Sequence, residues 1–219
     1  MLGTPTVRVQ AMFAIGLLLL TASLAAGQTD TTPPDTAEPS KTSQWLQFVG
    51  GAAVGFGAHE SGHVFFDVVF DASPGVKRIE FAGIPFFAVT HDADVSAREE
   101  FTISSAGFWV QEGTSEWLLT SHPHLKDERA PFLKGWLAWN VVASGVYSVA
   151  AFGRFGPPER DTRGMATSLN VPEPWIGVLI AAPAALDTWR YLHPESRWAR
   201  WASRATKVGG VLLVIAAHY

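Results

Sequence analysis

The chain has no cysteine among its 219 residues. This absence excludes a disulfide framework, a zinc ribbon, a cysteine-ligated iron–sulfur cluster and a thiol nucleophile. A metal ion would therefore have to be bound by histidine and carboxylate side chains. Charge is scarce as well, because 16% of the residues are charged against about 25% in an ordinary soluble domain. The 16 basic and 20 acidic residues give a net charge of −4, and without a dense basic stripe no nucleic-acid partner is expected.

Apolar residues are abundant instead. They make up 47% of the chain, which includes 9 Trp and 14 Phe, so disorder over most of the chain is excluded. Several stretches are long or apolar enough to be candidate membrane spans: Trp45–Phe70, Phe101–Leu119, Phe132–Phe152 and Trp175–Leu192. Val76–Val89 has aromatic and β-branched residues around a Gly-Ile-Pro break, which predicts a short β-hairpin. We expect an all-α membrane protein with about four transmembrane helices and this hairpin inserted after the first.

The polar residues divide the chain into three parts. Residues 1–27 have the pattern of a signal peptide or N-terminal anchor, with Arg8, an apolar run over 11–20 and small residues at 23–27. The short apolar run favours a cleaved signal, although an uncleaved anchor stays open. Residues 28–44 are rich in Thr, Pro and Ser and predict a flexible polar linker. Residues 45–219 are then the helical membrane domain, integral to the cell membrane, with lipid as a partner and with an exported N-terminus.

The chemical signal lies in the first apolar stretch, where His59-Glu60-Ser61-Gly62-His63 matches H-E-x-x-H. On a helix the two histidines share one face and can bind one metal ion. Glu60 is then close enough to act on a water molecule at that ion, as the general base of a zinc peptidase does. Ionisable residues inside an apolar stretch are energetically costly and usually mark a function. The motif therefore predicts Zn²⁺ as cofactor, bound by His59 and His63, with Glu60 as the catalytic residue.

The segment AHESGHVFFDVVF resembles the H-E-x-G-H helix of the site-2 protease family of intramembrane zinc metalloproteases. In that family a short β segment follows this helix, as Val76–Val89 would here. The family's next helix carries Ala-Gly-Pro-x-x-Asn, where this chain has Ala106-Gly107-Phe108-Trp109-Val110-Gln111. A later helix carries Leu-Asp-Gly, matched here by Leu186-Asp187-Thr188. The resemblance implies a membrane-embedded zinc protease with Asp187 as third ligand; Phe108, Gln111 and Thr188 depart from the family pattern.

The third metal ligand has rival candidates. Asp187 is isolated in an apolar stretch, but it could instead pair with Arg190 one helical turn away. Glu112 and Glu116 are the alternatives, because Gln111–Glu116 is similar to the Asn-Glu-x-x-Ser-Asp segment of thermolysin-like enzymes, whose Glu binds zinc, and two histidines with a glutamate form a known catalytic set. Asp67 could orient the His63 ring.

Three functions follow from these patterns. The first is hydrolysis of peptide bonds in a membrane-associated peptide or protein substrate. The second is a catalytically inactive membrane scaffold or metal-binding protein of the same architecture. The third is an exported thermolysin-like zinc peptidase with Glu112 as ligand. The sequence names neither the substrate nor the oligomeric state.

Overall fold

The computed structural model describes residues 39–81, 84–91 and 94–216. The predicted signal or anchor at 1–27, and residues 28–38 of the predicted linker, lie outside this range. By its contacts the chain forms two units, Met1–Gln44 and Trp45–Tyr219. The end of the predicted linker differs from expectation, because helix α2 already begins at Lys41. The Ser40 hydroxyl accepts a hydrogen bond from the Ser43 amide at 3.2 Å, which satisfies one donor of the first helical turn.

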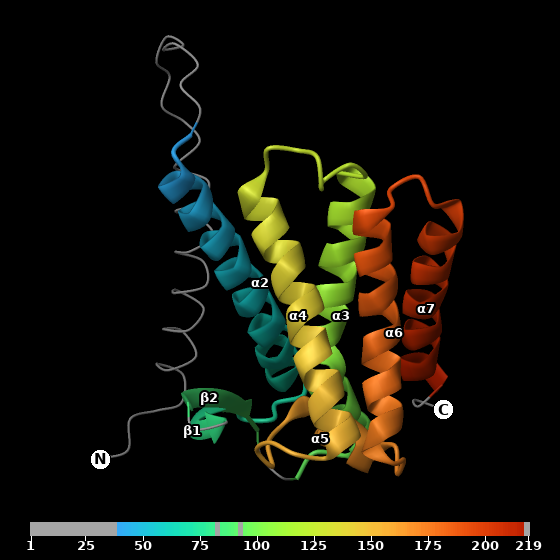
Figure 1. Ribbon diagram of the computed structural model, residues 1–219. Helices are drawn as coiled ribbons and strands as arrows, with labels where there is room; N and C mark the ends of the chain where they lie inside the picture. The colour runs from blue at the N-terminus through green and yellow to red at the C-terminus, as the bar shows by residue number, and fades with distance from the viewer. Residues whose placement is uncertain (1–38, 82–83, 92–93, 217–219) are drawn as a thin grey trace. The chain divides into compact units, whose positions relative to one another are not determined.

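The described chain is mostly helical, with one small sheet (Figure 1). The elements in chain order are α2 (Lys41–Val69), β1 (Gly75–Phe81), β2 (Ile84–Thr90), α3 (Ala97–Ser121), α4 (Pro131–Gly153), α5 (Asp161–Ser168), α6 (Glu173–Leu192) and α7 (Arg197–Ala216). The two strands pair antiparallel, from Gly75 opposite Thr90 to Phe81 opposite Ile84. The predicted helical fold and the hairpin after the motif helix are confirmed.

Local signals in the sequence explain several helix ends. At the start of α3, Ser96 and Glu99 form a reciprocal capping box that satisfies two backbone amides. Helix α4 begins with Pro131, whose missing N–H is not needed in the first turn. It ends before Arg154, which has a left-handed backbone with φ of 52°.

Glycines bring α2 against its neighbours. A Cβ added at Gly62 would lie 2.9 Å from the backbone carbonyl carbon of Ala106 in α3, and one added at Gly51 would lie 1.8 Å from the carbonyl oxygen of Phe132 in α4. Neither position therefore has room for a side chain, and the helix backbones are nearly in contact. This close approach holds the motif helix in place between α3 and α4.

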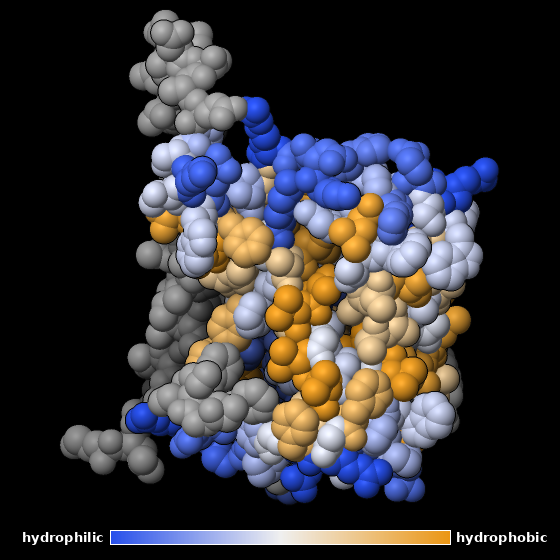
Figure 2. Space-filling view, viewed as in Figure 1, coloured by the Kyte–Doolittle hydropathy of each residue, from blue (hydrophilic) through white to orange (hydrophobic). Residues whose placement is uncertain are grey.

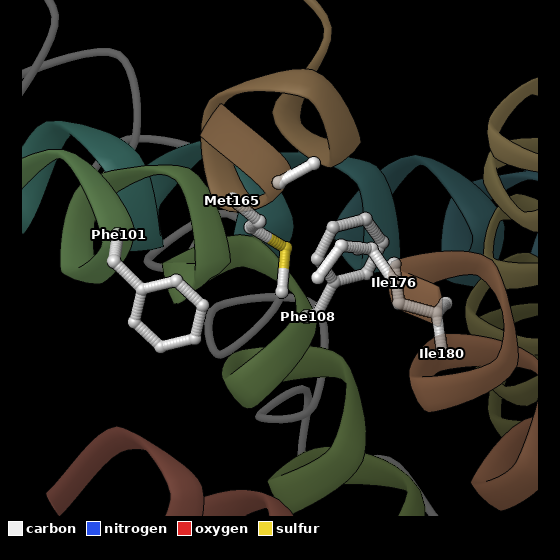
Figure 3. Close-up of a cluster of buried hydrophobic side chains, with 6 residues drawn as sticks. Phe101, Phe108, Met165, Ile176 and Ile180 are labelled. Carbon is white, nitrogen blue, oxygen red and sulfur yellow. The ribbon is translucent and has the colours of Figure 1, made fainter. Parts of the chain in front are cut away.

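Helix α5 is fixed by an apolar cluster shown in Figure 3. The Met165 side chain points from α5 between Phe101 and Phe108 of α3 and the isoleucines Ile176 and Ile180 of α6. All five side chains are at most 4% exposed. Burial of an apolar side chain of this size contributes about 1.5–3 kcal/mol, so the cluster fixes α5 firmly against α3 and α6.

One described helix, α4, is long and apolar enough to cross a membrane. The bent pair α5 and α6, with 119° between the two helices, satisfies the same criterion when taken together. Among the described residues length and composition thus support one span, or two, where the sequence predicted about four. On the face of the molecule drawn in Figure 2, hydrophobic side chains gather across the middle, over α4 and α6, and hydrophilic residues lie at both ends of these helices.

Candidate metal centre

The two histidines of the motif converge as predicted. His59 and His63 lie one turn apart on α2, are 2% and 5% exposed, and bring their Nε2 atoms to 3.2 Å from each other. Their i, i+4 spacing places both rings on the same side of the helix. The face is buried, so these imidazoles are shielded from bulk water.

The third member of the group is Asp161, which the sequence analysis did not consider. Its Oδ2 lies 3.3 Å from Nε2 of His59 and 3.5 Å from Nε2 of His63. Within the described chain, these three residues form a group whose ligand atoms could hold one metal ion. Asp161 is the first residue of α5, so the packing of Met165 determines where this carboxylate lies.

The histidine rings are oriented by their surroundings. Nδ1 of His63 lies 2.7 Å from the carbonyl oxygen of Ile103, so Nδ1 carries the proton and donates it. The lone pair of Nε2 is then free to face the centre, which is the usual arrangement of a metal-binding histidine. Asp67, proposed from sequence as the orienting group, is replaced in that role by this backbone carbonyl.

His59 is held by ring contacts and by a glycine. Its imidazole meets Phe108 edge to face at 5.4 Å and stacks on Tyr147 at 5.8 Å. On α3, a Cβ at Gly107 would lie 2.4 Å from its Cε1 atom. Gly107 therefore provides the space in which the ring sits.

The distances fit a small metal ion. Tetrahedral zinc with bonds of about 2.0–2.2 Å places its ligand atoms roughly 3.3–3.6 Å apart. The three observed separations, from 3.2 to 3.5 Å, agree with that geometry. Two nitrogens and one carboxylate oxygen also form an accepted catalytic ligand set. The site can therefore hold a metal ion, and the donor atoms are of the type that zinc accepts.

Glu60 lines the same cavity as His59, His63 and Asp161. This cavity has a volume of about 370 Å³ and opens between α2, α4 and the hairpin. Its other walls are largely apolar, with Phe56, Ile79, Phe87, Trp139 and Val142 among the lining residues. A carboxylate beside three potential ligands, in a mostly apolar cavity, is the arrangement that the motif predicts for a general base.

The predicted third ligand is positioned elsewhere in the structure. Asp187 does not lie with the histidines: it accepts a hydrogen bond from Ser203 at 2.6 Å and pairs with Lys207 at 2.8 Å. The predicted alternative pairing with Arg190 is also present, at a longer 3.7 Å. Asp187 is 1% exposed, and a buried carboxylate needs such partners to remain ionised.

The rival ligands Glu112 and Glu116 belong to the same network. Glu116 binds Arg190 at 2.5 Å and Arg204 at 2.8 Å, and Lys207 lies 3.9 Å from Glu112. The acidic residues singled out in the sequence thus connect α3 and α6 to α7. Asp161 was missed because it lies in a Pro-rich polar segment; an acidic residue at the start of a short helix was the one available signal.

A second, polar cavity adjoins the centre and has a volume of about 200 Å³. His63 and Asp161 line both cavities. Beyond them lies His91, whose Nε2 is 2.7 Å from Glu100. This hydrogen bond to Glu100 raises the pKa of His91 above its ordinary value of 6.5, more than partial burial lowers it. Near the cavity rim, hydrogen bonding to Lys77 lowers the pKa of Glu159.

Comparison with known proteins adds no relative: no family model, no curated protein and no solved structure matches the chain.

Proposed function

We propose that this chain is a membrane-embedded zinc metallopeptidase that cleaves membrane-associated peptides or proteins. The observation that carries the proposal is the presence of Glu60 in the cavity lined by His59, His63 and Asp161. A metal ligand set alone would suit many binding proteins. A free carboxylate beside it, within a cavity large enough for part of a peptide, is what hydrolysis needs.

Each residue has a definite task in this mechanism. His59, His63 and Asp161 would hold zinc, which when bound polarises a peptide carbonyl and acidifies water. Glu60 accepts the proton of the attacking water and passes it to the leaving amine, so peptide-bond cleavage needs no second acid. Ile103 keeps the proton of His63 on Nδ1 through its carbonyl, which preserves the lone pair on Nε2.

The cavity walls indicate the substrate class. Aromatic and aliphatic residues of α2, α4 and both strands surround the ligands, and charged side chains are few. Such walls favour apolar side chains over charged ones. We therefore expect cleavage next to apolar residues, as in a segment of membrane-associated protein.

Membrane embedding is supported by surface composition. Large apolar side chains are exposed along α2, α4, α6 and α7, including Trp45, Val142, Val149, Trp175 and Leu212. So many exposed apolar side chains are unusual for a soluble monomer and mark contact with lipid or another protein. Together with α4 as a candidate span, they favour a bilayer.

The decisive test uses Glu60→Gln in the full chain, reconstituted in phosphatidylcholine vesicles with fluorogenic apolar peptides. We expect about one zinc ion to remain at this centre and peptide cleavage to fall by at least 100-fold, the usual loss for a general base. Glu80→Gln, on the exposed side of β1, is the matched control and should leave cleavage unchanged. Full cleavage by Glu60→Gln would refute the mechanism. Zinc binding without cleavage of any peptide by the unmodified chain would favour the inactive scaffold.

A further inference from the structure

Asp67 is the most unusual side chain that the proposed mechanism leaves unused. It is 0% exposed, and both of its carboxylate oxygens lack a hydrogen-bond partner. It lines the polar cavity beside the candidate metal centre. Burial of an ionised carboxylate without a partner costs several kcal/mol, so Asp67 in its ionised form needs a ligand that balances its charge.

The nearest nitrogen is Nδ1 of His91, which lies 3.5 Å from Oδ1 of Asp67. This separation is long for a hydrogen bond, which is normally 2.7–3.2 Å. It agrees instead with two ligands of one tetrahedral ion, which lie roughly 3.3–3.6 Å apart. The same 3.5 Å separates His63 from Asp161 in the first centre.

The other side of the His91 ring is already fixed. Glu100 accepts a hydrogen bond from Nε2 at 2.7 Å and is itself held by the Ser104 hydroxyl at 2.7 Å. When Nε2 carries the proton, the lone pair of Nδ1 faces Asp67. A carboxylate that orients a histidine in this way is the usual outer partner of a metal ligand.

No arginine or lysine takes the place of such an ion. Arg160 is the one arginine or lysine among the described residues lining this cavity. Its guanidinium is bound to Glu173 at 2.6 and 2.7 Å. When His91 is neutral, the negative charge of Asp67 is left for a bound cation, and the cavity of about 200 Å³ has room for the water molecules that complete its coordination.

We propose that Asp67 and His91 form a second binding site for a divalent transition-metal ion, with Glu100 orienting His91. Asp67 belongs to α2 and His91 follows β2 directly, so the ion links the hairpin to the motif helix. Because Phe87 and Val89 of β2 line the first cavity, the ion fixes one wall of that cavity. The proposal does not depend on peptide hydrolysis.

Metal counting on the full chain in detergent tests this site. The protein is stripped with chelator, titrated with Zn²⁺, desalted and analysed by mass spectrometry. We expect two ions per chain for the unmodified protein and one for Asp67→Asn or His91→Gln. The double variant His59→Ala/His63→Ala should also keep one ion, at the second site.

His122→Gln is the matched control, because His122 likewise binds a carboxylate, Glu128, at 2.7 Å, but pairs with no second carboxylate in the described part of the chain. It should keep two ions. One ion per chain in the unmodified protein, lost in His59→Ala/His63→Ala, would overturn the second site while leaving the first intact. The number of bound ions does not change the expected loss of peptide cleavage in Glu60→Gln. The second metal site and the proposed peptidase function can therefore be refuted independently.

A second readout uses tryptic cleavage at the exposed Lys77 and Arg78 of β1. Zn²⁺ should slow this cleavage at least several-fold in the unmodified chain and in His59→Ala/His63→Ala, because the second ion anchors the hairpin. It should not slow cleavage in His91→Gln. Equal Zn²⁺ protection of His91→Gln and of the unmodified chain would overturn the link between hairpin and helix.

Discussion

Replacement of Gly107 by alanine should weaken metal binding although Gly107 is not a ligand. The new Cβ would lie 2.4 Å from Cε1 and 2.6 Å from both ring nitrogens of His59. An ordinary contact needs at least 3.4 Å, so the ring has to retreat by about 1 Å. Metal–ligand distances tolerate shifts of only about 0.2 Å.

Neighbouring side chains restrict the movement of the His59 ring. Phe108 lies against its edge and Tyr147 is stacked on its face. Movement away from Gly107 therefore shifts Nε2 relative to Asp161. We expect zinc affinity to fall about 10- to 100-fold, the loss typical of a disturbed outer shell around a metal.

The assay is zinc competition against a chromophoric chelator, with thermal unfolding measured alongside. Gly113→Ala on the same helix is the control, because nothing lies within 4 Å of its added Cβ. Both variants gain up to about 1 kcal/mol in helix propensity, so a difference in zinc affinity between them reports the clash alone. Equal zinc affinities would refute the placement of His59 against Gly107.

Three further predictions concern charged groups. In the same competition assay, Asp161→Asn should lower zinc affinity more than 10-fold, whereas Asp187→Asn should leave it unchanged. A loss of zinc affinity in Asp187→Asn alone would instead support Asp187, the ligand predicted from the sequence. Arg190→Met should lower the free energy of unfolding in detergent by about 2 kcal/mol, because Arg190 is 3% exposed and its loss removes charged hydrogen bonds to Glu116; an unchanged unfolding midpoint would contradict this. In metal-free protein the His91–Glu100 bond should stabilise fully below about pH 6.5 and lose that contribution as pH rises through the raised pKa of His91. Glu100→Gln should flatten this pH dependence of unfolding, and an identical profile would contradict it.

The sequence was sufficient to predict those parts of the fold and of the candidate site whose residues are neighbours in the chain. His59, Glu60 and His63 lie within one and a half turns of one helix, so their convergence follows from helical geometry. The hairpin followed from strand-like residues over 76–89. Both predictions use contacts that are local in the chain, and both are confirmed as elements of the fold.

The place of Asp161 in the candidate metal site could not be predicted in this way because tertiary packing determines it. Asp161 lies 98 residues after His63 and reaches the centre only because Met165, one turn further along α5, is buried between α3 and α6. Asp187 was favoured because it is isolated in an apolar stretch. Its counter-charge, Lys207, lies on the next helix, and a single sequence does not show which distant cation pairs with which carboxylate.

The network around Asp187 also weighs against a soluble thermolysin-like enzyme. That function needs Glu112 as a metal ligand, but Glu112 lies near Lys207, at 3.9 Å, and is not part of the group formed by His59, His63 and Asp161. Glu116 of α3 and Asp187 of α6 thus bind α7, a helix that also exposes Trp198, Trp201 and Leu212. This helix is held to α3 and α6 by ion pairs and exposes apolar side chains elsewhere on its surface. Such a helix is suited to contact with lipid, as the proposed membrane-embedded peptidase requires.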